Sequence, residues 1–286
     1  MRRPIISKAV FLVKCQICRL LASSKWVVKL ARCVVRNHDN DCNADMQVNG
    51  ELLVLRRLLS SPRTKYPVVV DVGANVGEWS AAAAGLLGSR GGRLVAIDPI
   101  KYNLDNVRKK LEALHFNNFS LAQVAISDTH GTSSFYCAKT PEEGTTDSLF
   151  NMALIGYATD SIQVEVRKDT LAAVMEEKGV SDIYFLKIDI EGGEYFALKG
   201  IKPFLEDSRI NFIQIEFGHA ARAARVFLYD IVNFMGEFPY KMFVIMPTGI
   251  QPVAFTPFTE NKYAYINFLF VRNDLVSDLS DITLSS

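Results

Sequence analysis

The sequence predicts an α/β fold in which a seven-stranded, mostly parallel sheet carries helices on both faces, an arrangement called Rossmann-like. Three observations support this prediction. Apolar runs alternate with amphipathic runs from residue 51 onward, three of the apolar runs end in an acidic residue, and the first of them leads into a turn with two glycines. Parallel strands joined by right-handed crossovers bring such acids to one edge of the sheet.

The expected elements follow one another from the start of this region. The apolar pattern over Glu51–Leu59 predicts a helix that Pro62 stops. Further helices are expected from Glu78 onward and over 103–114. The runs typical of strands in this sheet are 68–72, 94–98, 119–127, 184–189, 212–217, 241–246 and 264–271.

One stretch departs from the strand–helix alternation. Residues 132–137 and 161–166 have the pattern of a β-hairpin, which we expect at the edge of the sheet. Between them, 138–160 contains glycines, a proline and several hydroxyl residues without a periodic pattern. This stretch is expected to form either a loop over a ligand site or a surface excursion.

The first strand ends in a turn that is typical of nucleotide sites, Asp71-Val72-Gly73-Ala74-Asn75-Val76-Gly77. Glycines let a backbone approach a ligand closely, and Asp71 stands where the strand stops and can meet a polar or cationic group. A dinucleotide fingerprint needs glycine at its first, third and sixth positions, which here hold Gly73, Asn75 and Glu78. The spacing Asp-x-Gly-x-Asn-x-Gly instead resembles the first motif of class I S-adenosylmethionine-dependent methyltransferases.

Two more strands end in acids. The run Arg93–Asp98 closes in Asp98, 25 residues after Gly73, which is the separation of one strand–helix–strand unit. An aspartate in this place could also cap a helix. The third run, from Tyr184, ends in Asp189-Ile190-Glu191-Gly192-Gly193-Glu194. Three acid-terminated strands in one alternating chain favour a shared ligand crevice.

Together these motifs resemble the FkbM-type methyltransferase family over residues 51–274. The matching residues are Asp71-Val-Gly-Ala-Asn-Val-Gly, Ala125-Ile-Ser-Asp128 with Gly131, and Leu186-Lys-Ile-Asp-Ile-Glu-Gly-Gly-Glu194 with Leu198 and Gly200. The resemblance implies the class I methyltransferase fold with its last strand antiparallel, S-adenosylmethionine as the cofactor, and Asp98 bound to both ribose hydroxyls; the family usually carries Glu at that position. The residues expected around the cofactor are Asp71, Gly73, Ala74, Asn75, Gly77, Asp98 and Ser127.

The candidate catalytic residues are the titratable groups expected at the strand ends, Asp189, Glu191, Glu216 and His219. Asp189 and Glu191 are the stronger candidates, because two carboxylates at one strand end could orient an acceptor hydroxyl or hold a divalent ion. Strand alternation also places Lys187 and Asp189 on one face, where they could form a purely structural pair. His219 follows a strand and could be either a base or a helix cap. No dedicated metal site is expected.

The N-terminal segment has a strong charge bias. Residues 1–36 contain no acid and nine basic residues, namely Arg2, Arg3, Lys8, Lys14, Arg19, Lys25, Lys29, Arg32 and Arg36. Those from Lys8 onward fall within an arc of roughly 140° on a helical wheel, opposite an apolar stripe. This pattern predicts one or two basic amphipathic helices, which either contact an anionic membrane with Trp26 as anchor or pack on the following domain. The expected division is therefore 1–50 as this segment, 51–274 as the catalytic domain and 275–286 as a tail.

Cations interrupt every apolar run before it is long enough to span a bilayer, and a secretory signal does not fit. We expect a cytoplasmic protein; an organellar transit peptide remains an alternative. The sequence has five cysteines, an odd number that argues against a disulfide framework. Cys15 and Cys18 have zinc-knuckle spacing but lack a second pair, so reduced thiols are expected.

Composition is that of a globular enzyme, with 49% hydrophobic residues and a formal net charge of +1. Nothing in this composition points to nucleic acid as a partner. The resulting hypothesis is an S-adenosylmethionine-dependent methyltransferase that acts on a hydroxyl of a sugar, glycan or secondary metabolite. The alternatives are a methyltransferase for RNA or protein, and a noncatalytic membrane-associated adaptor that keeps the cofactor fold.

Overall fold

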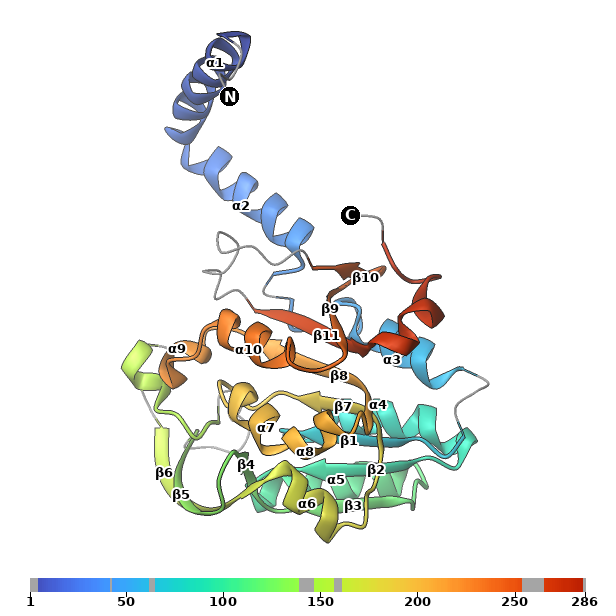
Figure 1. Cartoon of the computed structure of the whole chain (residues 1–286). Coiled ribbons are helices and arrows are strands. Elements are labelled where there is room, and N and C mark those ends of the chain that lie inside the picture. The colour runs from blue at the N-terminus through green and yellow to red at the C-terminus, as the bar shows by residue number, and fades with distance from the viewer. Residues whose placement is uncertain are drawn as a thin grey trace. The chain divides into compact units, whose positions relative to one another are not determined.

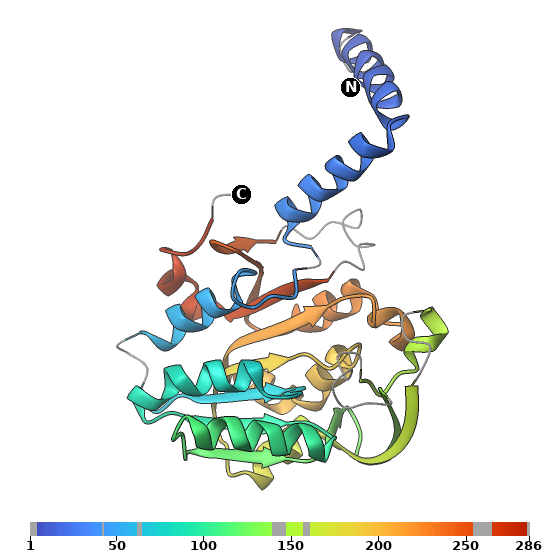
Figure 2. The same cartoon turned by 180° about the vertical axis from the view of Figure 1, so that it is seen from behind.

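The computed structural model describes residues 5–41, 43–61, 65–138, 147–156, 161–253 and 265–284. The chain divides into two compact units, 1–42 and 43–286. The smaller unit is helical, and the larger one contains both β-sheets (Figures 1 and 2).

The larger unit is built on an eight-stranded sheet with the order β10-β9-β11-β8-β7-β1-β2-β3. Its strands are β1 Val68–Val72, β2 Arg93–Ile97, β3 Phe119–Ala122, β7 Ile183–Ile188, β8 Ile210–Phe217, β9 Tyr240–Met246, β10 Gly249–Pro252 and β11 Ile266–Arg272. Strands β3, β2, β1, β7 and β8 are parallel, whereas β11 runs antiparallel to both β8 and β9. The predicted α/β fold is confirmed; the eighth strand, β10, pairs antiparallel with β9 and was not predicted.

The central strands are buried on both faces, which explains why they read as continuous apolar runs. One core lies under the helices α3 Glu51–Leu59, α4 Glu78–Leu87 and α5 Lys101–Ala113. The other lies under α6 Leu171–Glu177, α7 Glu194–Gly200, α8 Lys202–Glu206 and α10 Leu228–Met235. Figure 1 shows the two sets of helices on opposite sides of the sheet. All the predicted helices of this region are present.

The predicted hairpin exists, but not at the edge of the main sheet. Strands β5 Gly131–Ala138 and β6 Ser161–Thr170 pair antiparallel, and β4 Ala125–Ser127 pairs with β6 in a separate three-stranded sheet. The single strand expected over 119–127 is therefore divided, because the chain leaves the main sheet after β3 and joins β6 instead.

The loop expected over 138–160 is only partly described. Residues 139–146 and 157–160 lie outside the described residues. The described part includes Ser148, whose backbone exchanges hydrogen bonds of 2.8 and 2.9 Å with Tyr136, and a short 3₁₀ helix, Met152–Ile155. This part of the chain is therefore attached to the three-stranded sheet.

Residues just before α3 are fixed within the larger unit. Gly50 has φ +99°, and a Cβ at this position would lie 2.1 Å from the Met246 carbonyl oxygen. The buried Asn49 side chain donates hydrogen bonds to the Asn43 carbonyl and to the Glu51 carboxylate. In the last turn of α3, Arg57 Nε lies 2.6 Å from Asp281 Oδ2. These contacts fix both ends of α3 and, at its N-terminus, the side chain of Glu51.

The smaller unit consists of two helices in succession, α1 Ile5–Ala22 and α2 Lys25–Asp39. Ser24 separates them and caps α2, because its side chain accepts a hydrogen bond from the backbone N–H of Val27. None of the helices among the described residues combines the length and the apolarity needed to cross a membrane.

Candidate functional site

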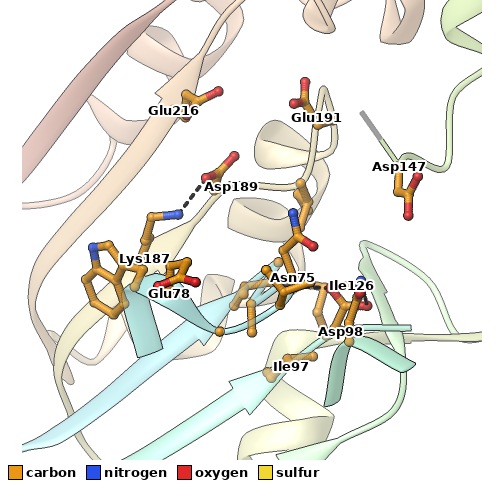
Figure 3. Close-up of a pocket in the computed structure, with 18 of the residues that line it drawn as sticks. Asn75, Glu78, Ile97, Asp98, Ile126, Asp147, Lys187, Asp189, Glu191 and Glu216 are labelled. Carbon is orange, nitrogen blue, oxygen red and sulfur yellow. Dashed lines mark hydrogen bonds and ion pairs between the residues drawn. The ribbon is translucent and has the colours of Figure 1, made fainter. Parts of the chain in front are cut away.

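A cavity of about 450 Å³ opens at the carboxyl ends of β1, β2, β7 and β8. This position is where doubly wound sheets bind ligands, and the volume lies within the range of small-molecule sites. Figure 3 shows acidic side chains from several strand ends facing this cavity. The predicted residues that line it are Gly73, Ala74, Asn75, Gly77, Asp98, Asp189, Glu191 and Glu216.

The glycine turn after β1 is held by backbone hydrogen bonds. The N–H groups of Gly73 and Ala74 both donate to the Ile97 carbonyl, at 2.9 and 3.0 Å. Gly73 has φ +85°, and a Cβ there would lie 1.8 Å from the Asp189 carbonyl oxygen. A Cβ on Gly77 would lie 2.9 Å from Val107 Cα. Both glycines are therefore required for packing within the protein, and both also line the cavity.

Asp98 lies at the end of β2 with only 6% of its surface exposed, and it faces the cavity. Its Oδ2 accepts a hydrogen bond from the Asn75 N–H at 3.0 Å, and its Oδ1 accepts from the Ile100 N–H at 2.8 Å and from Asn103 Nδ2 at 3.1 Å. Burial raises the pKa of Asp98 to about 6, although these three hydrogen bonds oppose the shift. Asp98 thus joins the glycine turn to the start of α5.

A buried ion pair lies beside the turn. Lys187 Nζ is 2.5 Å from Asp189 Oδ2, and its side chain also lies over the ring of Trp79, 5.8 Å from the centroid (Figure 3). Burial lowers the pKa of Lys187, but attraction to Asp189, Asp71 and Glu51 outweighs this and raises the value overall. Lys187 is therefore a fixed cation within a group of carboxylates.

The loop after β7 gives Glu191 an unusual backbone conformation, with φ +49°. Both oxygens of the buried Glu194 carboxylate accept backbone N–H groups, from Ile190 at 3.0 Å and from Gly192 at 3.2 and 3.0 Å. Ser148 Oγ donates to the Glu191 carbonyl at 2.7 Å. Positive φ is uncommon for a residue with a Cβ and persists only where its surroundings enforce it. These contacts therefore hold the Glu191 side chain at the cavity.

Two of the acids at the site, Glu191 and Glu216, resist ionisation. Burial raises the pKa of Glu191 to about 8, and the nearby charges of Asp189 and Glu194 add to the effect. Burial also raises the pKa of Glu216 well above its ordinary range, together with repulsion from Asp189 and Glu191, whereas a hydrogen bond with Tyr265 acts in the opposite direction. Carboxyl groups in such surroundings become stronger bases when they do ionise.

Three predicted residues lie outside the cavity lining. Asp71 is fully buried, and its Oδ2 accepts a 2.5 Å hydrogen bond from Ser80. Ser127 packs at α7, where a Cβ on Gly200 would come within 2.3 Å of its carbonyl oxygen. His219 follows β8, and its side chain is not among the groups that line the cavity.

Several lining residues were not predicted as site residues, among them Glu51, Trp79, Asp147 and Tyr265. Trp79 is the second residue of α4, two residues after Gly77, so its position next to the turn could have been recognised from the sequence. Two amide side chains hold the Glu51 carboxylate at the site. Its Oε2 accepts a hydrogen bond from Gln214 Nε2 at 2.6 Å, and its Oε1 accepts one from Asn267 Nδ2 at 3.4 Å. These contacts join residues 163 and 216 positions apart, and no local pattern indicates them.

The charged groups that line the cavity are mostly acidic. Beside Lys187 they comprise eight carboxylates, from Asp45, Glu51, Glu78, Asp98, Asp147, Asp189, Glu191 and Glu216. Over the parts of the chain that the structure describes, no three His, Cys, Asp or Glu side chains form a group that could hold a metal ion.

Comparison with known families identifies the class of protein. Residues 71–242 match the model of the methyltransferase FkbM domain. This match spans more than half of the chain and includes the glycine turn, Asp98 and the loop after β7. The chain belongs to the FkbM methyltransferase family, and its fold is that of the class I S-adenosylmethionine-dependent methyltransferases.

Similar folds occur among solved structures. A methyltransferase FkbM from Methylobacillus flagellatus KT is 17% identical, with a TM-score of 0.46; the match covers 73% of this chain and 44% of that one. The METTL16 methyltransferase domain is 10% identical, with a TM-score of 0.43 and coverage of 77% and 66%. An rRNA methylase from Streptococcus thermophilus is 11% identical, with a TM-score of 0.39 and coverage of 77% and 94%. No curated protein sequence matches the chain.

Proposed function

We propose that this protein is an S-adenosylmethionine-dependent O-methyltransferase whose acceptor is a hydroxyl of a sugar, glycan or secondary metabolite. The observation that carries the proposal is the position of Glu191. Its carboxyl group faces the cavity from a backbone conformation that Glu194 and Ser148 enforce, next to Asp189 and Glu216.

The cavity fits the cofactor in the chemistry of its lining. The buried Asp98 carboxylate at the end of β2 provides an acceptor for ribose hydroxyls, with the apolar side chains of Ile97 and Ile126 beside it for an adenine ring. The turn from Gly73 to Gly77 lines the cavity where the methionine portion would lie. The excess of carboxylates favours a cationic sulfonium over an anionic ligand. S-adenosylmethionine supplies the electrophilic methyl group.

Methylation of a hydroxyl requires that its oxygen be oriented and that its proton be removed. Lys187 pairs with Asp189, which makes Asp189 suited to orient the acceptor rather than to take its proton. Glu216 shares a hydrogen bond with Tyr265. Glu191 has no such side-chain partner among the described residues, and burial makes its carboxylate more basic. We therefore assign Glu191 as the general base and Asp189 and Glu216 as acceptor-binding residues.

The charge of the cavity also bears on the class of acceptor. The acidic side chains that line the cavity outnumber its one lysine even when Glu191 and Glu216 are protonated, so the cavity favours a neutral or cationic acceptor over a phosphodiester chain such as RNA. A sugar or a hydroxylated metabolite can hydrogen-bond to several carboxylates at once, because each of its hydroxyls is a donor.

Two measurements test the proposal. Isothermal titration with S-adenosylmethionine should show binding, and incubation of protein and cofactor with mixed sugars, glycans and metabolites should yield products heavier by one methyl group. Asp189→Asn should lower turnover with a smaller effect on cofactor affinity. Cofactor binding without methyl transfer to any acceptor would favour the noncatalytic adaptor, and transfer to RNA or protein alone would overturn the acceptor class.

A further inference from the structure

The helices of the smaller unit have a large apolar surface that they do not cover themselves. In α1 the exposed apolar side chains include Leu20, 76% exposed, and Phe11, 65% exposed. In α2, Trp26 is 71% exposed and Val34 is 60% exposed. Ser24 caps α2, and the two helices follow one another end to end rather than side by side (Figures 1 and 2). Neither helix therefore shields the apolar face of the other.

The charges of α2 are sharply separated from its apolar face. At about 100° per residue, Lys25, Lys29, Arg32 and Arg36 fall within an arc of about 60°. Trp26, Leu30 and Val34 are spaced by four residues and lie together on the adjoining face. The only acid in the helix is its last residue, Asp39. A row of cations along one edge of an apolar face is typical of helices that lie in a membrane interface.

We propose that the helical segment 5–39 binds an anionic lipid surface. In this arrangement the cations of α2 contact acidic headgroups, Trp26 lies at the interface, and the apolar side chains of both helices enter the acyl boundary. Charge complementarity selects this partner. A nucleic acid would neutralise the cations but leave the apolar face in water, whereas a neutral apolar partner would leave the cations unmatched. A lipid surface satisfies both faces at the same time.

Vesicle flotation of the full-length chain tests the proposal. Phosphatidylcholine vesicles are compared with vesicles that also contain about 30% phosphatidylserine. The anionic phosphatidylserine surface attracts nearby Lys and Arg side chains, whereas the neutral surface does not. We expect the partition coefficient to rise at least about tenfold with phosphatidylserine and to fall again at high salt. Equal binding to both kinds of vesicle, or binding to neither, would overturn the proposal.

Charge-neutral variants locate the interaction within the chain. The test variant carries Lys25→Gln, Lys29→Gln, Arg32→Gln and Arg36→Gln. Its matched control carries the same number of neutralisations at exposed cations of the larger unit, namely Arg56→Gln, Lys65→Gln, Lys109→Gln and Lys241→Gln. We expect the test variant to lose at least about tenfold in vesicle binding and the control to keep it. An equal loss in both variants would show that net charge alone drives binding, which also overturns the proposal.

The apolar face has a separate test. Trp26→Ser with Leu30→Ser and Val34→Ser should reduce binding while leaving all the cations in place. The fluorescence of Trp26, taken as the difference between the wild type and Trp26→Phe, should shift to shorter wavelength when phosphatidylserine vesicles are added. Cofactor titration of every variant shows that the larger unit is folded. An unshifted Trp26 signal in a vesicle-bound protein would exclude insertion of α2.

Discussion

Glu191 combines backbone strain, partial burial and access to the cavity. Its loop is held by interactions that do not involve its own carboxyl group, so Glu191→Gln should leave the loop in place. We predict that this substitution lowers kcat by about 10²- to 10⁴-fold, the usual contribution of a general base, with cofactor affinity nearly unchanged. Single-turnover methyl transfer and calorimetry provide the two measurements. Glu206→Gln, at an exposed end of α8, serves as the matched control. If Glu191→Gln turns over normally, another group is the base.

The same residue sets an expected pH dependence. Because burial raises the pKa of Glu191 to about 8, the carboxylate that acts as a base is scarce at pH 6 and predominates only above pH 8. We predict that kcat/KM for the cofactor, which reports the free enzyme, increases with pH and levels off near that value. In the pH profile of kcat, which reports the cofactor-bound enzyme, the rise should lie at lower pH, because a bound sulfonium cation stabilises the Glu191 carboxylate. A profile that is flat between pH 6 and 9 would contradict the assignment.

Asp98 has a structural role and a proposed role in cofactor binding, which one substitution can separate. Its Oδ1 accepts from the Ile100 N–H and from Asn103, whereas Oδ2 faces Asn75 and the cavity. We predict that Asp98→Asn weakens cofactor binding by about 1.5–3 kcal/mol, the range for a hydrogen bond with a charged partner. Calorimetry measures the affinity. Asn103→Ala, which removes only one of the Oδ1 contacts, is the matched control for lost stability. Unchanged affinity in Asp98→Asn would mean that another group holds the ribose.

The turn between β1 and α4 depends on Gly73 in a way that concerns folding first. A Cβ there would lie 1.8 Å from the Asp189 carbonyl oxygen, and φ is +85°. We predict that Gly73→Ala lowers the free energy of unfolding by more than about 2 kcal/mol, because backbone atoms must shift and a positive φ is strained. Gly85→Ala, in the last turn of α4 with open space around it, should instead stabilise by about 0.5–1 kcal/mol. Chemical denaturation compares the two variants; equal stability of both would contradict the packing argument.

Local pattern was sufficient for most strands and helices of the main sheet. Buried parallel strands are short apolar runs, and the helices between them have a period of 3.6 residues, so both signals are local. The division between β3 and β4 was not predictable, because the apolar character continues through Val124 while the hydrogen-bond partner changes from β2 to β6. Which sheet a strand joins is decided by residues far away in the sequence. Strand β10 was missed for a different reason: it is only four residues long, although it pairs locally with β9 in a tight hairpin.

The site was predictable where it coincides with strand ends. Asp98, Asp189, Glu191 and Glu216 follow apolar runs, and the parallel topology brings them together. Asp147, in a loop, and Tyr265, directly before β11, were missed, because each reaches the cavity only through the tertiary fold. Ser127 and His219 were expected at the cavity, but their strands end with these side chains outside its lining.

The site acids together determine how stability depends on pH. Burial raises the pKa of Asp98 to about 6, that of Glu194 to about 7 and that of Glu191 to about 8. A carboxyl group whose pKa is higher in the folded state stabilises the fold when protonated. This contribution is fully present below its ordinary pKa near 4 and is lost as the pH rises through the folded value.

We therefore predict that Tm falls between pH 5 and pH 8.5, by at least several degrees, since about 1 kcal/mol corresponds to roughly 2–4 °C in a protein of this size. Differential scanning calorimetry across this range measures the effect. Addition of a cationic ligand should reduce the fall, because it favours the ionised acids. A Tm that is level or rises over this range would show that the acids do not resist ionisation.

The position of β11 has a consequence for how the chain is made. This strand, Ile266–Arg272, lies between β8 and β9, and its Asn267 also reaches Glu51, 216 positions earlier. During synthesis from the N-terminus, β8 and β9 emerge before the strand that separates them, so neither can complete its pairing within the nascent chain. Until about 270 residues have been made, both strands offer open edges to other chains. The contact between Glu51 and Asn267 also needs β11, so the cavity cannot be completed before this strand has been made, and protection from aggregation matters most up to that point.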